Sequence, residues 1–193
     1  MGIVATLGIV ATAAASVEVA LRPVALDAQD GRPFAIVDKR QATLSVYAAD
    51  GRLVGRTAAL LGLTPGDAEP ASARGKAPSA LGEHERVTPA GRFEAVPGRN
   101  LSGERVVWFN YDANLAIHRL RPVAAAQRRP QRLASADARD HRITLGCVVV
   151  EPAFFDEVVL PTLGNGPSLV YILPERDPRV AAGSSGQPHA AAP

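Results

Sequence analysis

The strongest constraint on the fold is a series of short apolar runs separated by residues typical of turns. Thr43–Tyr47 alternates in polarity, and Asp50-Gly51, a dipeptide typical of hairpins, follows it. Runs of this length with β-branched and aromatic residues predict strands rather than helices. The sequence therefore predicts a mainly β domain, a β-sandwich or open barrel of about seven to eight strands with one or two short helices.

The turn residues also set the expected element boundaries. The predicted strands are 33–38, 43–47, 52–63, 91–96, 105–111, 115–120, 143–150 and 168–173. Pro97-Gly98 is expected to end the strand 91–96. Pro152 and Pro161 bracket a predicted helix over 152–160. A long surface loop is predicted over 64–86, and an arginine- and alanine-rich segment over 121–140 shows no clear amphipathic pattern.

The length of 193 residues predicts one domain, which we assign to 31–175. Residues 1–30 form an apolar N-terminal segment and a linker, and the uncharged stretch Gly2–Ser16 has the length of a signal-peptide core. No basic residue precedes it, so a misplaced start codon or a core strand are the alternatives. Residues 176–193 predict a disordered tail. We expect export to the periplasm or cell envelope, with transient membrane contact through the N-terminal segment.

Composition excludes several classes of function. The formal net charge is only +2, too small to indicate nucleic-acid binding. A single cysteine rules out an intrachain disulfide and a cysteine-based zinc cluster, and the four histidines lack paired metal-ligand spacing. We expect no metal and no cofactor, although a zinc site of histidines and carboxylates stays open. The oligomeric state is not indicated.

Cys147 is the candidate nucleophile. Gly146 precedes it and permits a tight turn, which can direct neighbouring amide hydrogens at the oxyanion of a tetrahedral intermediate. A free thiol has a pKa of about 8.5, and a nearby imidazole lowers that pKa or takes the proton directly. The alternative is that Cys147 is a small buried hydrophobic residue.

His118 is the candidate base. Strand alternation places it on one face with Ala116 and Leu120, so a hydrogen-bonded core histidine is the alternative. Arg119 cannot accept a hydrogen bond, and we expect a backbone carbonyl to orient the His118 ring.

Four segments, taken in order, resemble the catalytic domain of L,D-transpeptidases, the YkuD-type family. They are Pro33–Tyr47, Thr88–Phe93, Ala116–His118 and Thr144–Cys147. The resemblance spans about residues 33–173, nearly the whole predicted domain. It implies a YkuD-like fold and an exported enzyme of cell-wall biogenesis.

The resemblance also implies a mechanism. Cys147 would attack the carbonyl that follows a meso-diamino acid in a peptidoglycan tetrapeptide and release D-Ala. His118 would act as general base, the Leu145–Cys147 amides would form the oxyanion hole, and an acceptor amine would resolve the thioester. The expected substrate contacts are Thr144, Leu145, Arg142 and Arg119.

Three features depart from the family pattern. Leu145 replaces the histidine of the family's Ser/Thr-His-Gly-Cys box, and Val149 replaces an Asn or Arg. The separation between His118 and Cys147 is longer than usual. Three alternatives therefore stay open: a hydrolase on the same peptides, a wall-binding module that lost turnover, and a basic protein that binds anionic polymers.

The arginine-rich segment after His118 is either a substrate lid or a solvated basic loop. Arginines bind carboxylates in a bidentate manner, and stem peptides carry several carboxylates. The arginines in and beside the segment are Arg119, Arg121, Arg128, Arg129, Arg132, Arg139 and Arg142. His141 is a candidate second imidazole near Cys147, in place of the one lost at Leu145.

Overall fold

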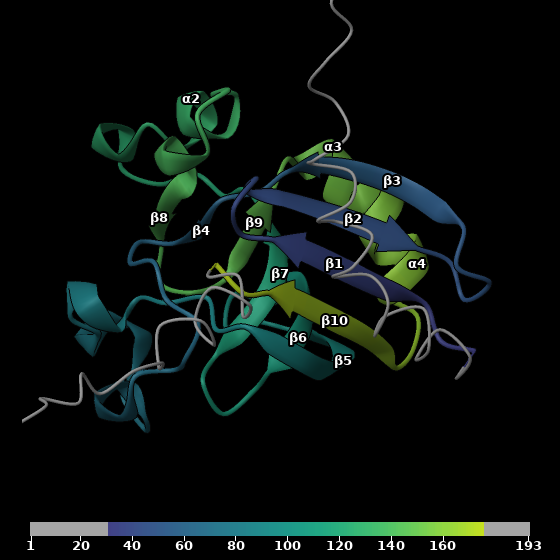
Figure 1. Cartoon of the computed structure of the whole chain (residues 1–193), viewed down its shortest axis with the longest axis horizontal. Helices are drawn as coiled ribbons and strands as arrows, with labels where there is room; N and C mark the ends of the chain where they lie inside the picture. Colours follow the sequence, from purple (N-terminus) through teal and green to yellow (C-terminus); the bar gives the residue numbers. More distant parts are fainter. Residues whose placement is uncertain (1–30, 176–193) are drawn as a thin grey trace, which may run out of the picture.

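The computed structural model describes residues 31–175, and it is dominated by one curved sheet of eight strands (Figure 1). The mainly β fold is confirmed. Along the sheet the strands are β3 (Leu53–Ala58), β2 (Thr43–Tyr47), β1 (Phe34–Asp38), β10 (Ser168–Leu173), β5 (Gly91–Arg99), β6 (Arg105–Asn110), β7 (Leu115–Arg119) and β9 (Val148–Val150). A separate pair joins β4 (Leu61–Gly62) to β8 (Arg142–Thr144).

The sheet curls until it nearly closes on itself. Its last strand, β9, pairs in parallel with β7 and also bonds to Leu60, which lies just after β3. Leu60 N donates to Val149 O at 2.7 Å, and Val149 N donates to Leu60 O at 2.9 Å. The two ends of the sheet are thus joined, which gives the predicted barrel-like form.

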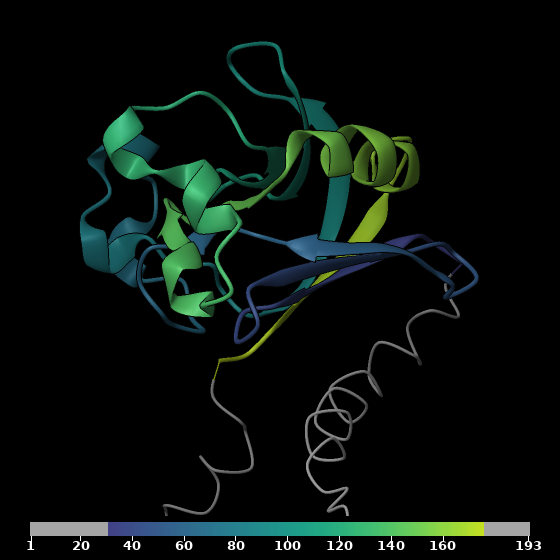
Figure 2. The ribbon, with the colours of Figure 1, turned by 90° about the horizontal axis from the view of Figure 1, so that it is seen from above.

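A helical segment packs into the curve of the sheet. It consists of α3 (Pro152–Phe154), the π-helical turn η7 (Phe155–Val159) and α4 (Leu160–Leu163). Its buried face joins the main core with inward-facing strand residues. Gly55 on β3 makes this contact close, because a Cβ there would lie 3.0 Å from the Phe154 ring. Figure 2 shows the segment on one side of the sheet.

Two sequence predictions about proline were wrong. β5 continues through Pro97 to Arg99. Its partner β10 begins at Ser168, opposite Ala95, so beyond Ala95 only β6 pairs with β5, and a residue without an amide hydrogen is tolerated there. The helical segment also continues past Pro161 to Leu163, because Pro161 falls in the first turn of a new α-helical stretch, after the π-helical turn.

Two predicted strands are each divided in the structure. The expected strand 52–63 becomes β3 and β4, because the chain leaves the large sheet to pair with β8. The expected strand 143–150 becomes β8 and β9, separated by the turn that carries Cys147. The first division follows from the long-range pairing of β4 with β8, whereas Gly146 marks the second one locally.

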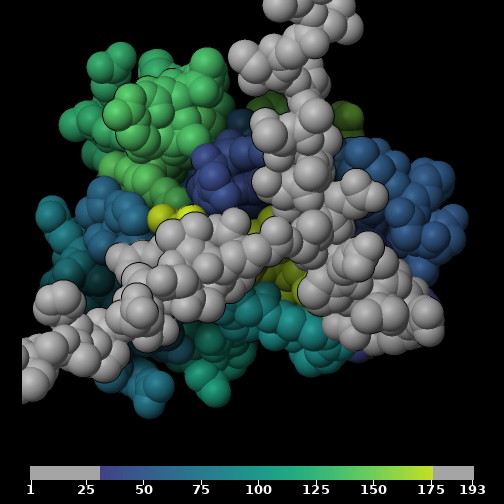
Figure 3. Space-filling model, viewed as in Figure 1, coloured from purple at the N-terminus to yellow at the C-terminus, as the bar shows by residue number. Residues whose placement is uncertain are grey.

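The two irregular segments of the sequence lie at one end of the sheet. Residues 64–86 contain the 3₁₀ turns η2 (Ala71–Ala73), η3 (Pro78–Ala80) and η4 (Glu83–Glu85). Residues 121–141 contain η5 (Ala125–Gln127), α2 (Arg129–Leu133) and η6 (Ala138–His141), and we call them the arginine insert. The insert forms the green lobe in Figure 3. Leu133 anchors it against Leu60 and Val149.

The predicted signal segment and tail lie outside the described residues. Within 31–175 no helix is long and apolar enough to cross a membrane.

Candidate active site

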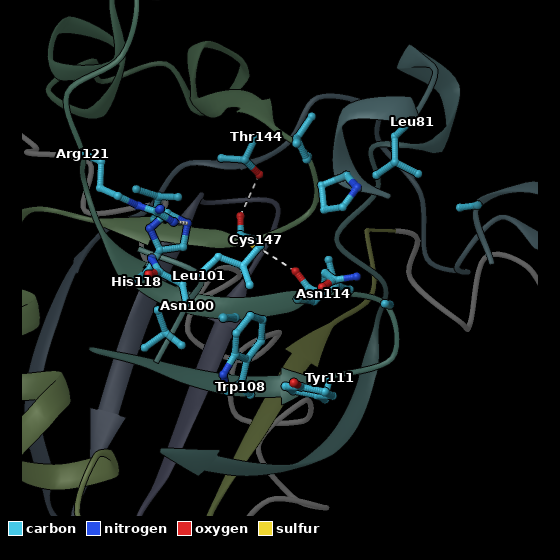
Figure 4. A pocket seen from close by; sticks show the side chains of 18 of the residues that line it. Leu81, Asn100, Leu101, Trp108, Tyr111, Asn114, His118, Arg121, Thr144 and Cys147 are labelled. Carbon is cyan, nitrogen blue, oxygen red and sulfur yellow. Dashed lines mark hydrogen bonds between the residues drawn. The ribbon is translucent and has the colours of Figure 1, made fainter. Parts of the chain in front are cut away.

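Parallel pairing of β7 and β9 brings the candidate nucleophile and base together. His118 is in register with Val149 and Ile117 with Val148, so Cys147, one residue before β9, lies beside Ala116. Both Cys147 and His118 line one cavity of about 760 Å³. Figure 4 shows the two side chains in this cavity, below Thr144. Segment 64–87 and the arginine insert supply much of the remaining wall.

A tight turn at Gly146 fixes the backbone of Cys147. Gly146 has φ +125°, and a Cβ there would lie 2.7 Å from Val87 O and 2.8 Å from Leu115 Cδ2. Only glycine fits this position, because a side chain would be both strained and in contact with backbone. Thr144 Oγ1 accepts a hydrogen bond from Gly146 N at 3.1 Å and donates one to Cys147 O at 2.7 Å.

Thr88 holds the same turn from the other side. Its fully buried hydroxyl donates to Gly146 O at 2.9 Å and accepts from Gly62 N at 2.9 Å. Its carbonyl accepts from the buried Lys39 Nζ at 3.0 Å. The Thr-Pro segment around Thr88 therefore supports the turn that carries Cys147, a role that its sequence alone did not indicate.

The His118 ring is held at both nitrogens. Nδ1 lies 2.8 Å from Arg119 O, and because a carbonyl only accepts, Nδ1 carries the hydrogen. A backbone carbonyl therefore orients the ring, as expected. Nε2 then carries the ring's lone pair, and that lone pair accepts a hydrogen bond from Arg121 Nη2 at 3.4 Å. In the free protein the atom that would take the thiol proton thus faces a guanidinium.

Burial keeps both candidate catalytic groups neutral. It lowers the pKa of His118 to about 4, against a smaller opposite effect of the Arg119 carbonyl. Burial also raises the pKa of the Cys147 thiol, although the Ala116 backbone and the charges of Arg121 and Arg129 oppose this. The thiol donates to Asn114 O at 3.5 Å. The resting pair is therefore thiol and imidazole, without a preformed ion pair.

The structure brings some of the sequence-predicted substrate contacts together and leaves others elsewhere. Thr144 and Leu145 line the cavity. Arg119 lies outside it, near Glu104 at 3.4 Å and Asp156 at 3.6 Å.

Two further residues proposed from the arginine-rich segment also lie outside the cavity. Arg142 Nη2 bonds to Lys39 O and Glu175, both at 3.0 Å. His141 is buried between the carbonyls of Ala59 and Ser135, at 3.1 Å from each, and does not line the cavity.

Sequence reasoning did not single out several residues of the cavity wall. Arg121 and Arg129 were members of the arginine-rich run, but nothing in the run distinguished them from Arg128, which is exposed. Trp108 and Tyr111 form an edge-to-face pair with ring centroids 5.3 Å apart on the opposite wall. Within 31–175 no group of three His, Cys, Asp or Glu side chains is placed to hold a metal ion.

No protein-family model and no curated protein sequence matches the chain. Solved L,D-transpeptidase structures are similar to it. The catalytic domain from E. faecium is 16% identical over 74% of this chain and 98% of that chain, with a TM-score of 0.43. The Mycobacterium smegmatis L,D-transpeptidase is 13% identical over 74% of this chain and 58% of that chain, with a TM-score of 0.41.

The helical cell shape determining protein Pgp2 from Campylobacter jejuni is 15% identical over 76% of this chain and 49% of that chain, with a TM-score of 0.48. The match thus covers little more than half of the M. smegmatis protein and about half of Pgp2.

Proposed function

We propose that this chain is a cysteine acyltransferase of the cell envelope that acts on peptidoglycan stem peptides by L,D-transpeptidation. The observation that carries the proposal is that Cys147 and His118 line one cavity from adjacent parallel strands, with the ring oriented by Arg119 O. The ordered sequence segments that resemble L,D-transpeptidases supply the substrate class.

The proposed reaction has two steps. Cys147 Sγ forms a bond to the scissile carbonyl carbon, and His118 Nε2 takes the thiol proton. The C–N bond then breaks, His118 gives that proton to the leaving amine, and a thioester remains. An acceptor amine attacks the thioester carbonyl carbon, and His118 Nε2 takes a proton from that amine. The C–S bond then breaks, His118 returns the proton to the sulfur of Cys147, and the new amide remains, whereas water in place of the amine gives hydrolysis.

Because both groups rest neutral, proton transfer accompanies attack instead of preceding it. A neutral imidazole with a free Nε2 lone pair is the form that can accept the thiol proton. The Leu145 and Cys147 amides are the proposed oxyanion donors, since Gly146 N already donates to Thr144 Oγ1.

The test is covalent capture of the thiol. We expect a carbapenem to add one molecule to the protein, observed by intact-mass spectrometry, and Cys147→Ala to abolish the adduct. His118→Gln should slow adduct formation by about 10²–10⁴-fold, the range of general acid–base catalysis. The proposal fails if the wild-type protein forms no adduct, or if Cys147→Ala forms it equally.

A second candidate function is binding of wall peptides without turnover. The contact between Arg121 Nη2 and His118 Nε2 favours this function, because it occupies the lone pair that would take the thiol proton. Leu145 also favours it, since it stands where the Ser/Thr-His-Gly-Cys motif of L,D-transpeptidases has a histidine. The raised pKa of the Cys147 thiol points the same way. Under this function the protein would retain peptidoglycan in a pull-down assay, and the thiol would react with neither carbapenem nor iodoacetamide.

A further inference from the structure

Two guanidinium groups of the arginine insert face the candidate catalytic pair. Arg121 and Arg129 both line the cavity with Cys147 and His118, and both are partly buried. Figure 4 shows Arg121 beside the His118 ring. Their positive charges act to lower the pKa of both His118 and Cys147. The other arginine at this end of the insert, Arg128, is exposed and outside the cavity wall.

The two charges are incompletely neutralised. Arg121 has one carboxylate near it, with Glu104 Oε2 at 3.3 Å from its Nε. Arg129 Nε donates to the neutral Gln127 Oε1 at 2.7 Å, and no carboxylate of residues 31–175 forms an ion pair with Arg129. Burial and the charge of Arg121 lower the pKa of Arg129. Two like charges in one partly buried wall repel each other, and an anion bound near both of them would relieve that repulsion.

The position of the pair indicates which anion fits. In the proposed reaction His118 returns its proton to the nitrogen of the leaving group. If the leaving group is a C-terminal amino acid, its carboxylate lies only two bonds from that nitrogen. A cationic group in contact with His118 Nε2 is therefore suitably placed for this carboxylate, and guanidinium binds carboxylate in a bidentate manner.

We propose that Arg121 and Arg129 bind the free carboxylate of the leaving residue, so that the site selects peptides cleaved at their terminal peptide bond. This inference rests on the proposed acyl transfer at Cys147. The carboxylate also competes for Arg121, the donor to His118 Nε2 in the free protein. Binding of the correct peptide end thus releases the lone pair that accepts the thiol proton.

The test compares N-acetyl-D-alanine with its amide, N-acetyl-D-alaninamide, which has the same shape without the charge. Binding to the full chain is followed by the imidazole NMR signals of His118. We expect the acid to bind about tenfold more tightly than the amide, because charge-assisted hydrogen bonds are the stronger ones. Arg121→Gln and Arg129→Gln should each remove most of that preference. Arg128→Gln makes the same charge change outside the cavity and should retain it.

The inference is overturned if acid and amide bind equally, if the acid does not bind, or if the three variants behave alike. Adduct formation with a carbapenem separates this inference from the proposed function. Arginine-dependent acid binding without adduct formation leaves the carboxylate site standing and removes the enzyme. Adduct formation without a preference for the acid leaves the proposed enzyme standing and removes the carboxylate site.

Discussion

The hydroxyl of Thr88 donates to the carbonyl of Gly146 at 2.9 Å, and this one bond links the segment before β5 to the turn that carries Cys147. The same oxygen accepts from Gly62 N, so Thr88 joins three separate parts of the chain. The geometry of Cys147 thus depends on a residue that does not line the cavity.

Thr88→Val preserves shape but leaves the Gly62 amide and the Gly146 carbonyl without this partner. We expect a loss of about 2–4 kcal/mol in the free energy of unfolding, since each buried unpaired group costs about 1–3 kcal/mol. Urea denaturation measures the loss, and the rate of Cys147 alkylation should change with it. Thr88→Ser keeps the hydroxyl and serves as the control. Equal stability of wild type and Thr88→Val would contradict the linking role.

Gly146→Ala should destabilise the protein more than a left-handed backbone alone explains. The added Cβ would approach Val87 O to 2.7 Å, whereas at Gly51, with φ +82°, it would meet nothing within 4 Å. Gly51→Ala therefore isolates the backbone cost of about 1–2 kcal/mol. We expect a clearly larger loss for Gly146→Ala, together with slower acylation of Cys147. Similar denaturation midpoints for the two variants would argue against a closed turn.

The pKa of about 4 at His118 predicts a specific pH dependence of stability. The folded pKa lies below the ordinary value of about 6.5. Between these two values the unfolded chain binds a proton at this histidine and the folded chain does not. The stability contribution is therefore present above pH 6.5 and is lost as pH falls towards 4, by about 3 kcal/mol in total. The charged groups that face the ring are Arg121, Arg129 and Glu104.

Urea denaturation at several pH values checks this prediction against His118→Gln, which lacks the titrating group. The difference in stability between wild type and variant should shrink as the pH is lowered through the window. A difference that is constant with pH would show that His118 titrates normally.

The buried cation of Lys39 is expected to contribute strongly to stability. The residue is 1% exposed, and its Nζ contacts Asp67 Oδ1 at 2.7 Å and Glu175 Oε1 at 3.6 Å, besides Thr88 O. Lys39→Met leaves these groups without their cation, so we expect a loss of about 3–5 kcal/mol. Arg40→Met, next to it on the hairpin and exposed, should cost less than about 0.5 kcal/mol. Calorimetry of both variants provides the measurement.

The positions of most strands along the sequence were predictable, because alternation and turn residues are local signals. Where those signals failed, pairing between distant segments decided the outcome. Pro97 continues a strand because β10 begins opposite Ala95, and nothing near Pro97 in the sequence encodes where β10 begins. The strand expected over 52–63 is likewise divided, because β4 leaves the large sheet to pair with β8.

The sequence indicated the two candidate residues of the site but not the residues that surround them. A lone cysteine after glycine and a histidine on a strand were singled out, and the structure places both in one cavity. Which arginines face that pair depends on how the insert folds, and a run of similar residues carries no such information. Arg142 and Arg119 were expected at the substrate, yet their side chains bond to acidic residues outside the cavity.

The bond between Leu60 and Val149 has a consequence for how the molecule fluctuates. Val149 comes two residues after Cys147, so one strand, β9, both closes the barrel and positions the thiol. β9 is also paired with β7, which carries His118, so opening of the seam alone leaves the thiol and the imidazole on paired strands. Hydrogen exchange at the Val149 amide would therefore record how often the barrel opens while the candidate pair stays together.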